Sequence, residues 1–142
     1  MTVVARLRLV AALVALAAVT ACGSVTPVYP DQNNIQYAQT DRTVGTGSTA
    51  AAGNTASVQY QLWLYSESGA DHKGSQIDSG AFQYLVGSTQ VIKGFDMAVT
   101  GMKVGGVRRA TVPPSLAYGS QGNQAIPPNA ALVFEITLVS VQ

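Results

Sequence analysis

The sequence contains one cysteine and one histidine among its 142 residues, and only 11% of its residues are charged. One cysteine excludes an intramolecular disulfide and a cysteine-rich zinc site, and one histidine excludes the usual multi-histidine metal sites. Eight basic and seven acidic side chains give a net charge of +1, so the chain lacks the excess of positive charge typical of nucleic-acid-binding proteins. We therefore expect no metal, no other cofactor and no nucleic-acid partner.

The N-terminal 21 residues hold much of the apolar composition, which reaches 47% over the whole chain. Arg6 and Arg8 precede an unbroken apolar run, Leu9–Val19. This run has the length of the apolar core of a signal peptide and is well short of the roughly 20 residues that a helix needs to span a bilayer. We predict an export signal over residues 1–21.

The end of this segment, Val19-Thr20-Ala21-Cys22, places small residues directly before the only cysteine. It resembles a bacterial lipobox, which implies cleavage before Cys22 and diacylation of its thiol through a thioether. Gly23 follows, and the absence of Asp there favours, by analogy with enterobacterial sorting, the periplasmic face of the outer membrane. The alternative is a plain secretory signal with an incidental cysteine.

The rest of the chain reads as one domain behind a short linker. Residues 22–34 contain two prolines and no apolar period, and they predict a lipidated N-terminus and tether before a domain over residues 35–142. No dimerisation helix is evident, so we expect a monomer. Residues 66–76 are polar and predict a loop in which His72, beside Asp71 and Lys73, is solvent-exposed and not catalytic.

Alternating apolar residues predict several strands and one helix. Strands are expected over residues 58–65, 82–86, 107–112 and 132–139. Residues 93–102 place Phe95, Ala98, Val99 and Met102 on one helical stripe, between glycines. One short helix among antiparallel strands indicates an α+β fold, with the helix packed on one face of the sheet.

Three stretches carry a family resemblance: QVIKGFDMAVTGMKVGG (90–106), RRATVPPSLAYG (108–119) and IPPNAALVFEITLVSV (126–141). Together they resemble the FK506-binding-protein (FKBP) type of peptidyl-prolyl cis-trans isomerase. The resemblance implies a twisted antiparallel sheet wrapped around one short helix. It also implies isomerisation of X-Pro bonds in exported or envelope proteins, and binding of proline-containing polypeptides and FK506-like macrolides. Such a reaction makes and breaks no covalent bond and needs no cofactor.

The resemblance also implies a proline pocket. Phe95 would be its floor and Tyr60, Phe82 and Phe134 its walls. Ile92 would offer its backbone N–H, and Tyr118 its hydroxyl, to substrate carbonyls. Asp78 would accept a hydrogen bond from Tyr60 near the twisting carbonyl. The remaining pocket residues would be Ile77, Val91 and Ile126, with Tyr84 near the edge of the set.

Three departures from the family pattern concern this pocket. Ile77 replaces the usual Phe, Phe95 replaces the most frequent Trp, and only residues 79–81 separate Asp78 from Phe82, so a flap is trimmed. Loss of one aromatic wall could weaken catalysis by one or two powers of ten, and each factor of ten is about 1.36 kcal/mol. The alternative function is therefore an FKBP-fold chaperone or proline-peptide binding module with weak or no turnover. A purely structural lipoprotein is disfavoured by the loop pattern at Tyr118 and Ile126.

Overall fold

The computed structural model describes residues 30–142. The predicted export signal and Cys22 lie outside these residues. The described part contains strands β1 (Ala38–Thr43), β2 (Thr55–Tyr65), β3 (Lys73–Leu85), β4 (Val107–Val112) and β5 (Leu132–Val141), helix α1 (Lys93–Val99), and the 3-10 turns Ala70–His72 and Pro114–Leu116. No helix in this part of the chain is long and apolar enough to cross a membrane.

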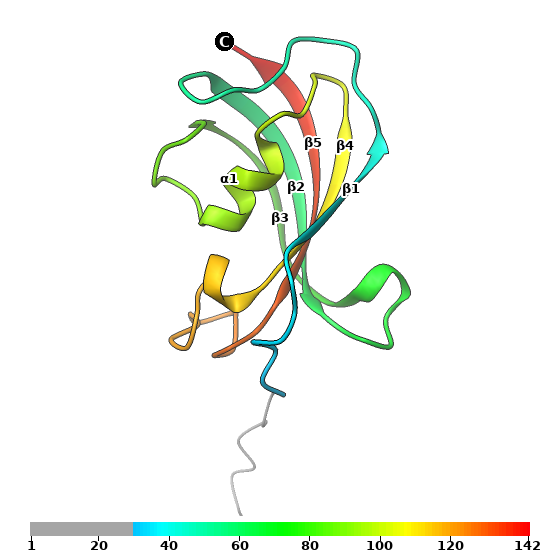
Figure 1. The fold of residues 1–142 in the computed structure, drawn as a ribbon, viewed down its shortest axis with the longest axis vertical. Helices are drawn as coiled ribbons and strands as arrows, with labels where there is room; N and C mark the ends of the chain where they lie inside the picture. Colours follow the sequence, from blue (N-terminus) through cyan, green and yellow to red (C-terminus); the bar gives the residue numbers. More distant parts are fainter. Residues whose placement is uncertain (1–29) are drawn as a thin grey trace, which may run out of the picture.

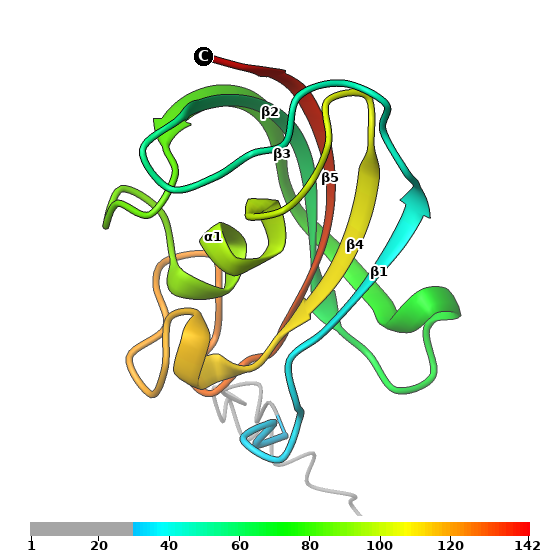
Figure 2. The same cartoon turned by 45° about the horizontal axis from the view of Figure 1, so that its top comes forward.

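The five strands form one antiparallel sheet in the order β1-β4-β5-β2-β3. The sheet curves around α1, which lies across its concave face (Figures 1 and 2). This arrangement confirms the predicted α+β class, and the C-terminal strand β5 lies at the centre of the sheet. It also brings segments far apart in the sequence side by side, because β5 pairs with β2 from Leu64↔Leu132 to Ala56↔Val141.

The core lies between the concave face and the helix. Alternate residues of β2, β4 and β5 point inward, as the period of two predicts, and α1 covers them with Phe95, Ala98 and Val99. The largest fully buried side chains are Leu132, Ile136, Leu138, Val58, Val86, Val99, Val112, Val133 and Pro114. The inner strands and the helix were therefore predictable from local patterns.

Helix α1 is shorter than the apolar stripe predicts and ends at Val99. Thr100 leaves the helical conformation, and Gly101 adopts a left-handed φ of 80°, which glycine tolerates at little cost. Met102 is still buried, but it reaches the core from this turn, where its N–H donates to the Val99 carbonyl. The prediction of the buried face is confirmed, and the predicted end of the helix is wrong.

Strand β3 differs most from the prediction. Residues 73–76 were predicted as loop and the strand was predicted only from Phe82, yet β3 is continuous from Lys73 to Leu85. β3 is an edge strand with most of its residues exposed, so its sequence carries little alternation to detect. Pairing with β2, which no local pattern encodes, holds it in place.

The linker also ends earlier than predicted. The Gln32 amide donates to the Tyr65 carbonyl at 3.2 Å and accepts from the Ala131 N–H at 2.8 Å, while its backbone N–H donates to Asn129. These bonds join the predicted tether to the β2 end and to the loop before β5. The domain's contacts therefore begin before Ile35.

Candidate active site

A cavity of about 540 Å³ opens between the concave face of the sheet and the start of α1. This volume lies in the range typical of small-molecule sites. Its lining comes from β2, β3, β5, α1, the loop before α1 and the loop after Pro114–Leu116: Tyr60, Leu62, Asp78, Phe82, Thr89, Gln90, Val91, Ile92, Phe95, Tyr118 and Phe134. It therefore contains most of the residues that the sequence analysis assigned to the proline pocket.

Aromatic side chains form the floor and walls of this cavity. Phe95 is 3% exposed, and its ring centroid lies 5.3 Å from Phe134, 5.6 Å from Phe82 and 6.1 Å from Tyr60. Tyr84 packs behind this group, 5.9 Å from Phe95. Several of these pairs are edge-to-face, an arrangement that aromatic rings favour. Phe95 contacts every wall, so it holds the position of the floor.

One hydrogen-bonded polar pair lies at the rim. The Tyr60 hydroxyl donates to Asp78 Oδ2 at 2.6 Å, and the other oxygen of Asp78 accepts from the Ser79 N–H at 2.8 Å. Burial, followed by the hydrogen bond to the Asp78 carboxylate, raises the pKa of Tyr60 to about 12. The phenol is therefore protonated at neutral pH, and Asp78 is held in a fixed orientation.

A β-bulge places Asp78 at this rim. Leu62 pairs with Asp78 while the next residue, Trp63, pairs with Gln76, so Ile77 is an extra residue on β3. In a regular strand consecutive side chains point to opposite faces. The bulge breaks this alternation, so that Ile77 packs against the core while Asp78 lines the cavity beside it.

Two further donors face the cavity from loops. Ile92 is the extended residue directly before α1, and within residues 30–142 its N–H takes part in no hydrogen bond. The side chain of Tyr118 is exposed, and its hydroxyl has no partner in the same part of the chain. Both groups therefore remain available as hydrogen-bond donors at the cavity.

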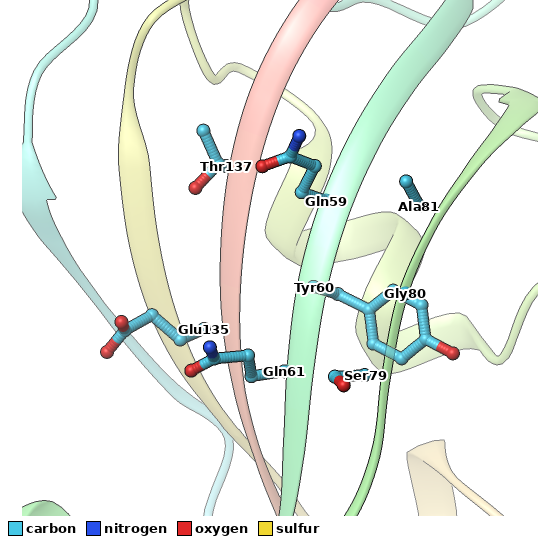
Figure 3. Close-up of a pocket in the computed structure, with 8 residues that line it drawn as sticks. All are labelled: Gln59, Tyr60, Gln61, Ser79, Gly80, Ala81, Glu135 and Thr137. Carbon is cyan, nitrogen blue, oxygen red and sulfur yellow. The ribbon is translucent and has the colours of Figure 1, made fainter.

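A second hollow, of about 470 Å³, lies on the opposite face of β2. Figure 3 shows its polar side chains, Gln59, Gln61, Glu135 and Thr137, and the Tyr60 ring lying beside Gly80 of β3. Among residues 30–142, Tyr60 is the one aromatic residue that lines this hollow. The aromatic cavity is therefore the better site for an apolar ring such as that of proline.

Two residues of the predicted pocket are not part of the cavity lining. Ile77 and Ile126 do not line the cavity: the first is the bulged residue packed on the core, and the second is 3% exposed in the core. Three lining residues were missed. Leu62 belongs to the inward face of β2, which the alternation does show, whereas Thr89 and Gln90 are loop residues without a local signal.

Possible metal ligands do not gather in the described residues, where no three His, Cys, Asp or Glu side chains come together. His72 is exposed, as expected, and stacks on Tyr65 with ring centroids 5.1 Å apart. It belongs to the turn Ala70–His72 between β2 and β3 and lines no part of the cavity.

Comparison with known sequences gives one family. The model for "FKBP-type peptidyl-prolyl cis-trans isomerase" matches residues 46–139. FK506-binding protein 4 of Gibberella zeae is 42% identical over 106 residues, which are 72% of this chain and 20% of that protein. FK506-binding protein 3 of Candida albicans is 41% identical over 102 residues, 72% of this chain and 23% of that protein. The chain thus spans about a fifth to a quarter of the length of the curated relatives it matches.

Solved structures give the same fold. A peptidyl-prolyl cis-trans isomerase of Pseudomonas syringae is 30% identical, covers 75% of this chain and 75% of its own, and has a TM-score of 0.63. FkpA of Escherichia coli is 28% identical and has a TM-score of 0.63, over 75% of this chain and 48% of FkpA.

Proposed function

The chain belongs to the FKBP-type peptidyl-prolyl cis-trans isomerase family, and from that premise we propose that it isomerises X-Pro bonds of polypeptides bound in the aromatic cavity. The observation that supports this most is the cavity itself, in which Phe95 forms a floor beneath aromatic walls and the Tyr60–Asp78 pair stands at the rim. An apolar five-membered ring fits a pocket of this chemistry.

The reaction is rotation about an amide bond, whose barrier is about 18–20 kcal/mol because of its partial double-bond character. As the amide twists, resonance is lost and the carbonyl dipole shrinks. A cavity that excludes water and offers apolar walls favours the less polar twisted amide over the planar ground state. Phe95, Phe82 and Phe134 supply these walls.

The polar groups at the rim orient the peptide. We propose that the Ile92 N–H and the Tyr118 hydroxyl donate to carbonyl oxygens on either side of the proline. Asp78, held by Tyr60, lies where the carbonyl before proline turns. Its negative charge disfavours the planar amide, whose oxygen carries more partial negative charge, so that the twisted state gains relative stability.

A kinetic assay tests this function. The chain should accelerate isomerisation of a short X-Pro peptide at micromolar enzyme, measured by protease coupling. Tyr118→Phe, which removes only the donor hydroxyl, should lower kcat/KM by about fivefold, the effect of one net hydrogen bond. Tyr65→Phe is the matched control, because this tyrosine stacks on His72 away from the cavity and should keep wild-type activity.

The second candidate is a chaperone or binding module of the same fold with little turnover, which the replacements Ile77 and Phe95 favour. A chain folded by circular dichroism that binds an FK506-like macrolide but does not accelerate isomerisation would support this candidate. A folded chain that neither binds nor isomerises would contradict both.

We also propose that the chain is exported and lipid-anchored, with clients among exported or envelope proteins. The support is the lipobox-like sequence before Cys22 and the preceding apolar run. Two or more acyl chains give stable anchoring. Mass spectrometry of the membrane fraction should find a diacylated Cys22 at the N-terminus, and Cys22→Ser should move the protein to the soluble fraction. An intact, unmodified N-terminus would refute the anchor without affecting the proposed activity.

A further inference from the structure

The outer edge of β3 passes directly beside the aromatic cavity. β3 is the last strand of the sheet, and its pairing with β2 is unbroken from Thr55↔Leu85 to Leu62↔Asp78. In an antiparallel pair, alternate residues turn both backbone groups toward the partner strand, and the residues between them turn both groups away. Every second residue of β3 between Asp78 and Leu85 therefore presents its N–H and carbonyl to the outside.

Two hydrogen bonds identify which residues these are. The Leu85 N–H donates to the Gln90 side chain at 2.9 Å, and the Ser79 N–H donates to Asp78 Oδ1 at 2.8 Å, so both point away from β2. By the same alternation the N–H groups of Ala81 and Gln83 also point outward. Within residues 30–142 no side chain or loop accepts from either of them, and both residues are exposed.

The two amides of β3 without an acceptor in residues 30–142 lie directly beside residues that line the cavity. The two side chains that cover the ends of the edge, Asp78 and Gln90, both line the cavity, and so does Phe82, which lies between the two free amides. Ala81 and Gln83 are thus each one residue, about 3.3 Å along the strand, from a wall of the proline pocket. The residues of a peptide next to a bound proline can therefore contact these two amides.

The side chains at this edge leave the backbone accessible. From Ser79 to Leu85 the strand has no charged residue and no proline, and its first three residues are Ser79, Gly80 and Ala81. Edge strands are commonly protected by charges, prolines or bulges, but the two register shifts of β3 both lie upstream, one at Ile77 and one between Lys73 and Gln76. On the face of the sheet opposite the cavity, the polar hollow that contains Gln59 and Gln61 of β2 extends to Ser79, Gly80 and Ala81 of β3 (Figure 3), where polar side chains of a paired chain can lie.

We infer that the edge of β3 at Ala81 and Gln83 binds the extended segment next to the substrate's proline as an added β-strand. This inference rests on the proposed function, because the proline in the cavity brings the segment to the edge. Main-chain hydrogen bonds give such pairing little dependence on sequence. The site therefore favours unfolded polypeptides over isolated X-Pro dipeptides.

Two peptides and two variants test the inference on the full chain, kept in solution with a mild non-ionic detergent. A ten-residue peptide with a central X-Pro bond and a blocked dipeptide with the same bond are compared by kcat/KM. Ala81→Pro removes an outward N–H without deleting a β2–β3 bond, and edge strands accept proline at such positions. Ala81→Val keeps the N–H. The ratio of long to short peptide should fall about fivefold in Ala81→Pro and keep the wild-type value in Ala81→Val.

Amide NMR of the wild-type chain provides a second measurement that does not depend on the folding of Ala81→Pro. The ten-residue peptide should slow hydrogen exchange at Ala81 and Gln83 and leave Ser79 and Leu85 unchanged, because these donors already have acceptors. Equal acceleration of both peptides, with no change at the two amides, would overturn the inference and leave the proposed function standing.

Two other outcomes are distinct. No acceleration of either peptide by a folded chain would refute the proposed function, while protection of Ala81 and Gln83 by the peptide would still support the edge site. Protection that rises with protein concentration in the absence of peptide would show that a second copy covers the edge, which would overturn the inference.

Discussion

The two edge strands of the sheet, β1 and β3, both contain a β-bulge, but the two bulges have different surroundings. β1 carries a bulge at Arg42 and β3 a bulge at Ile77. At the β1 edge the neighbouring residues are charged and ion-paired: Asp41 binds Arg108, and Arg42 and Arg109 both bind Asp71. At the β3 edge the bulge brings Asp78 to the aromatic cavity, and the strand beyond it is uncharged and open.

This difference suggests separate roles for the two edges: the β1 edge stabilises the fold, and the β3 edge serves the cavity. Arg108 is 7% exposed and joins β1, β4 and the end of α1, because it also donates to the carbonyls of Ala98 at 2.9 Å and Thr100 at 3.2 Å. No comparable buried charge is found at the β3 edge in the described residues. We expect changes at the β1 edge to alter folding and changes at the β3 edge to alter substrate turnover.

The largest effect is expected for Arg108→Met. The change leaves Asp41 without its partner and two carbonyls without a donor, so the free energy of unfolding should fall by about 2 kcal/mol, within the range for leaving buried polar groups without a hydrogen bond. Urea denaturation measures it, and kcat/KM per folded molecule should remain at the wild-type value. Lys73→Met removes a more exposed cation, which pairs with Glu135 and whose side chain is 24% exposed, against 9% for that of Arg108; it is the control and should cost less than about 1 kcal/mol. Equal losses in the two variants would contradict the comparison.

For Asp78→Asn we expect the opposite result, a loss of turnover with little change in the free energy of unfolding. The amide keeps the shape and an acceptor for Tyr60 but loses the negative charge, so kcat/KM should fall about tenfold, or 1.36 kcal/mol of transition-state stabilisation. Asp31→Asn is the matched control, because Asp31 accepts from the backbone N–H of Asn33, as Asp78 does from Ser79, but lies away from the cavity. A loss of folding stability in Asp78→Asn without a change in turnover would assign Asp78 a structural role.

Low pH should lower the free energy of unfolding through Asp41 of β1, and high pH should lower it through Tyr60 of β2, which binds Asp78 of β3. The hydrogen bond from Arg108 lowers the pKa of Asp41 below its ordinary 3.8, so its contribution is present above that pH and is lost as the pH falls through the lower folded value. The pKa of Tyr60 is raised from 10.0 to about 12, so its contribution is present below pH 10 and is lost as the pH rises from there. Unfolding free energies measured against pH should show both declines.

The variant Arg108→Met provides the control for the acid side. It should lose the part of the acid decline that comes from Asp41 while keeping the alkaline decline. An unchanged acid profile in this variant would show that Asp41 gains nothing from Arg108.

The smallest effect is expected for Gly80→Ala. Gly80 pairs with Tyr60, and a Cβ there would lie 3.4 Å from the Tyr60 ring, an ordinary contact. Because alanine restricts the unfolded chain, the free energy of unfolding should rise by about 0.5 kcal/mol, with kcat/KM within about twofold of wild type, since less than a net hydrogen bond is at stake. A lower melting temperature would show that the Tyr60 ring has no room to accept the methyl group.

Local patterns predicted the inner part of the molecule well. The alternation of Val58, Leu62 and Leu64 predicted β2, and the stripe of Phe95, Ala98 and Val99 predicted the buried face of α1. These elements have one face in the core and one in solvent, so their sequences carry the period. The polar strand β1 is exposed throughout, and the first half of β3 has no fully buried residue, so neither carries such a period.

The candidate site shows the same division. Family motifs identified Phe95, Tyr118 and Phe134, and the structure brings them to one cavity. The motifs also assigned Ile77 and Ile126 to that cavity, and the structure places both in the packing around it. The loop residues Thr89 and Gln90 line the cavity only because the loop before α1 folds against β3.

The sequence by itself thus determined the fold class, the inward faces and the aromatic character of the pocket, because burial imposes short periods and apolar side chains locally. Only the tertiary structure decided which strands became edges, where the bulges fall and which amides of β3 remain free. Strand pairing is a contact between residues far apart in the chain, and a shift of one residue in register moves every side chain to the other face. The open edge beside the pocket is a property of that register.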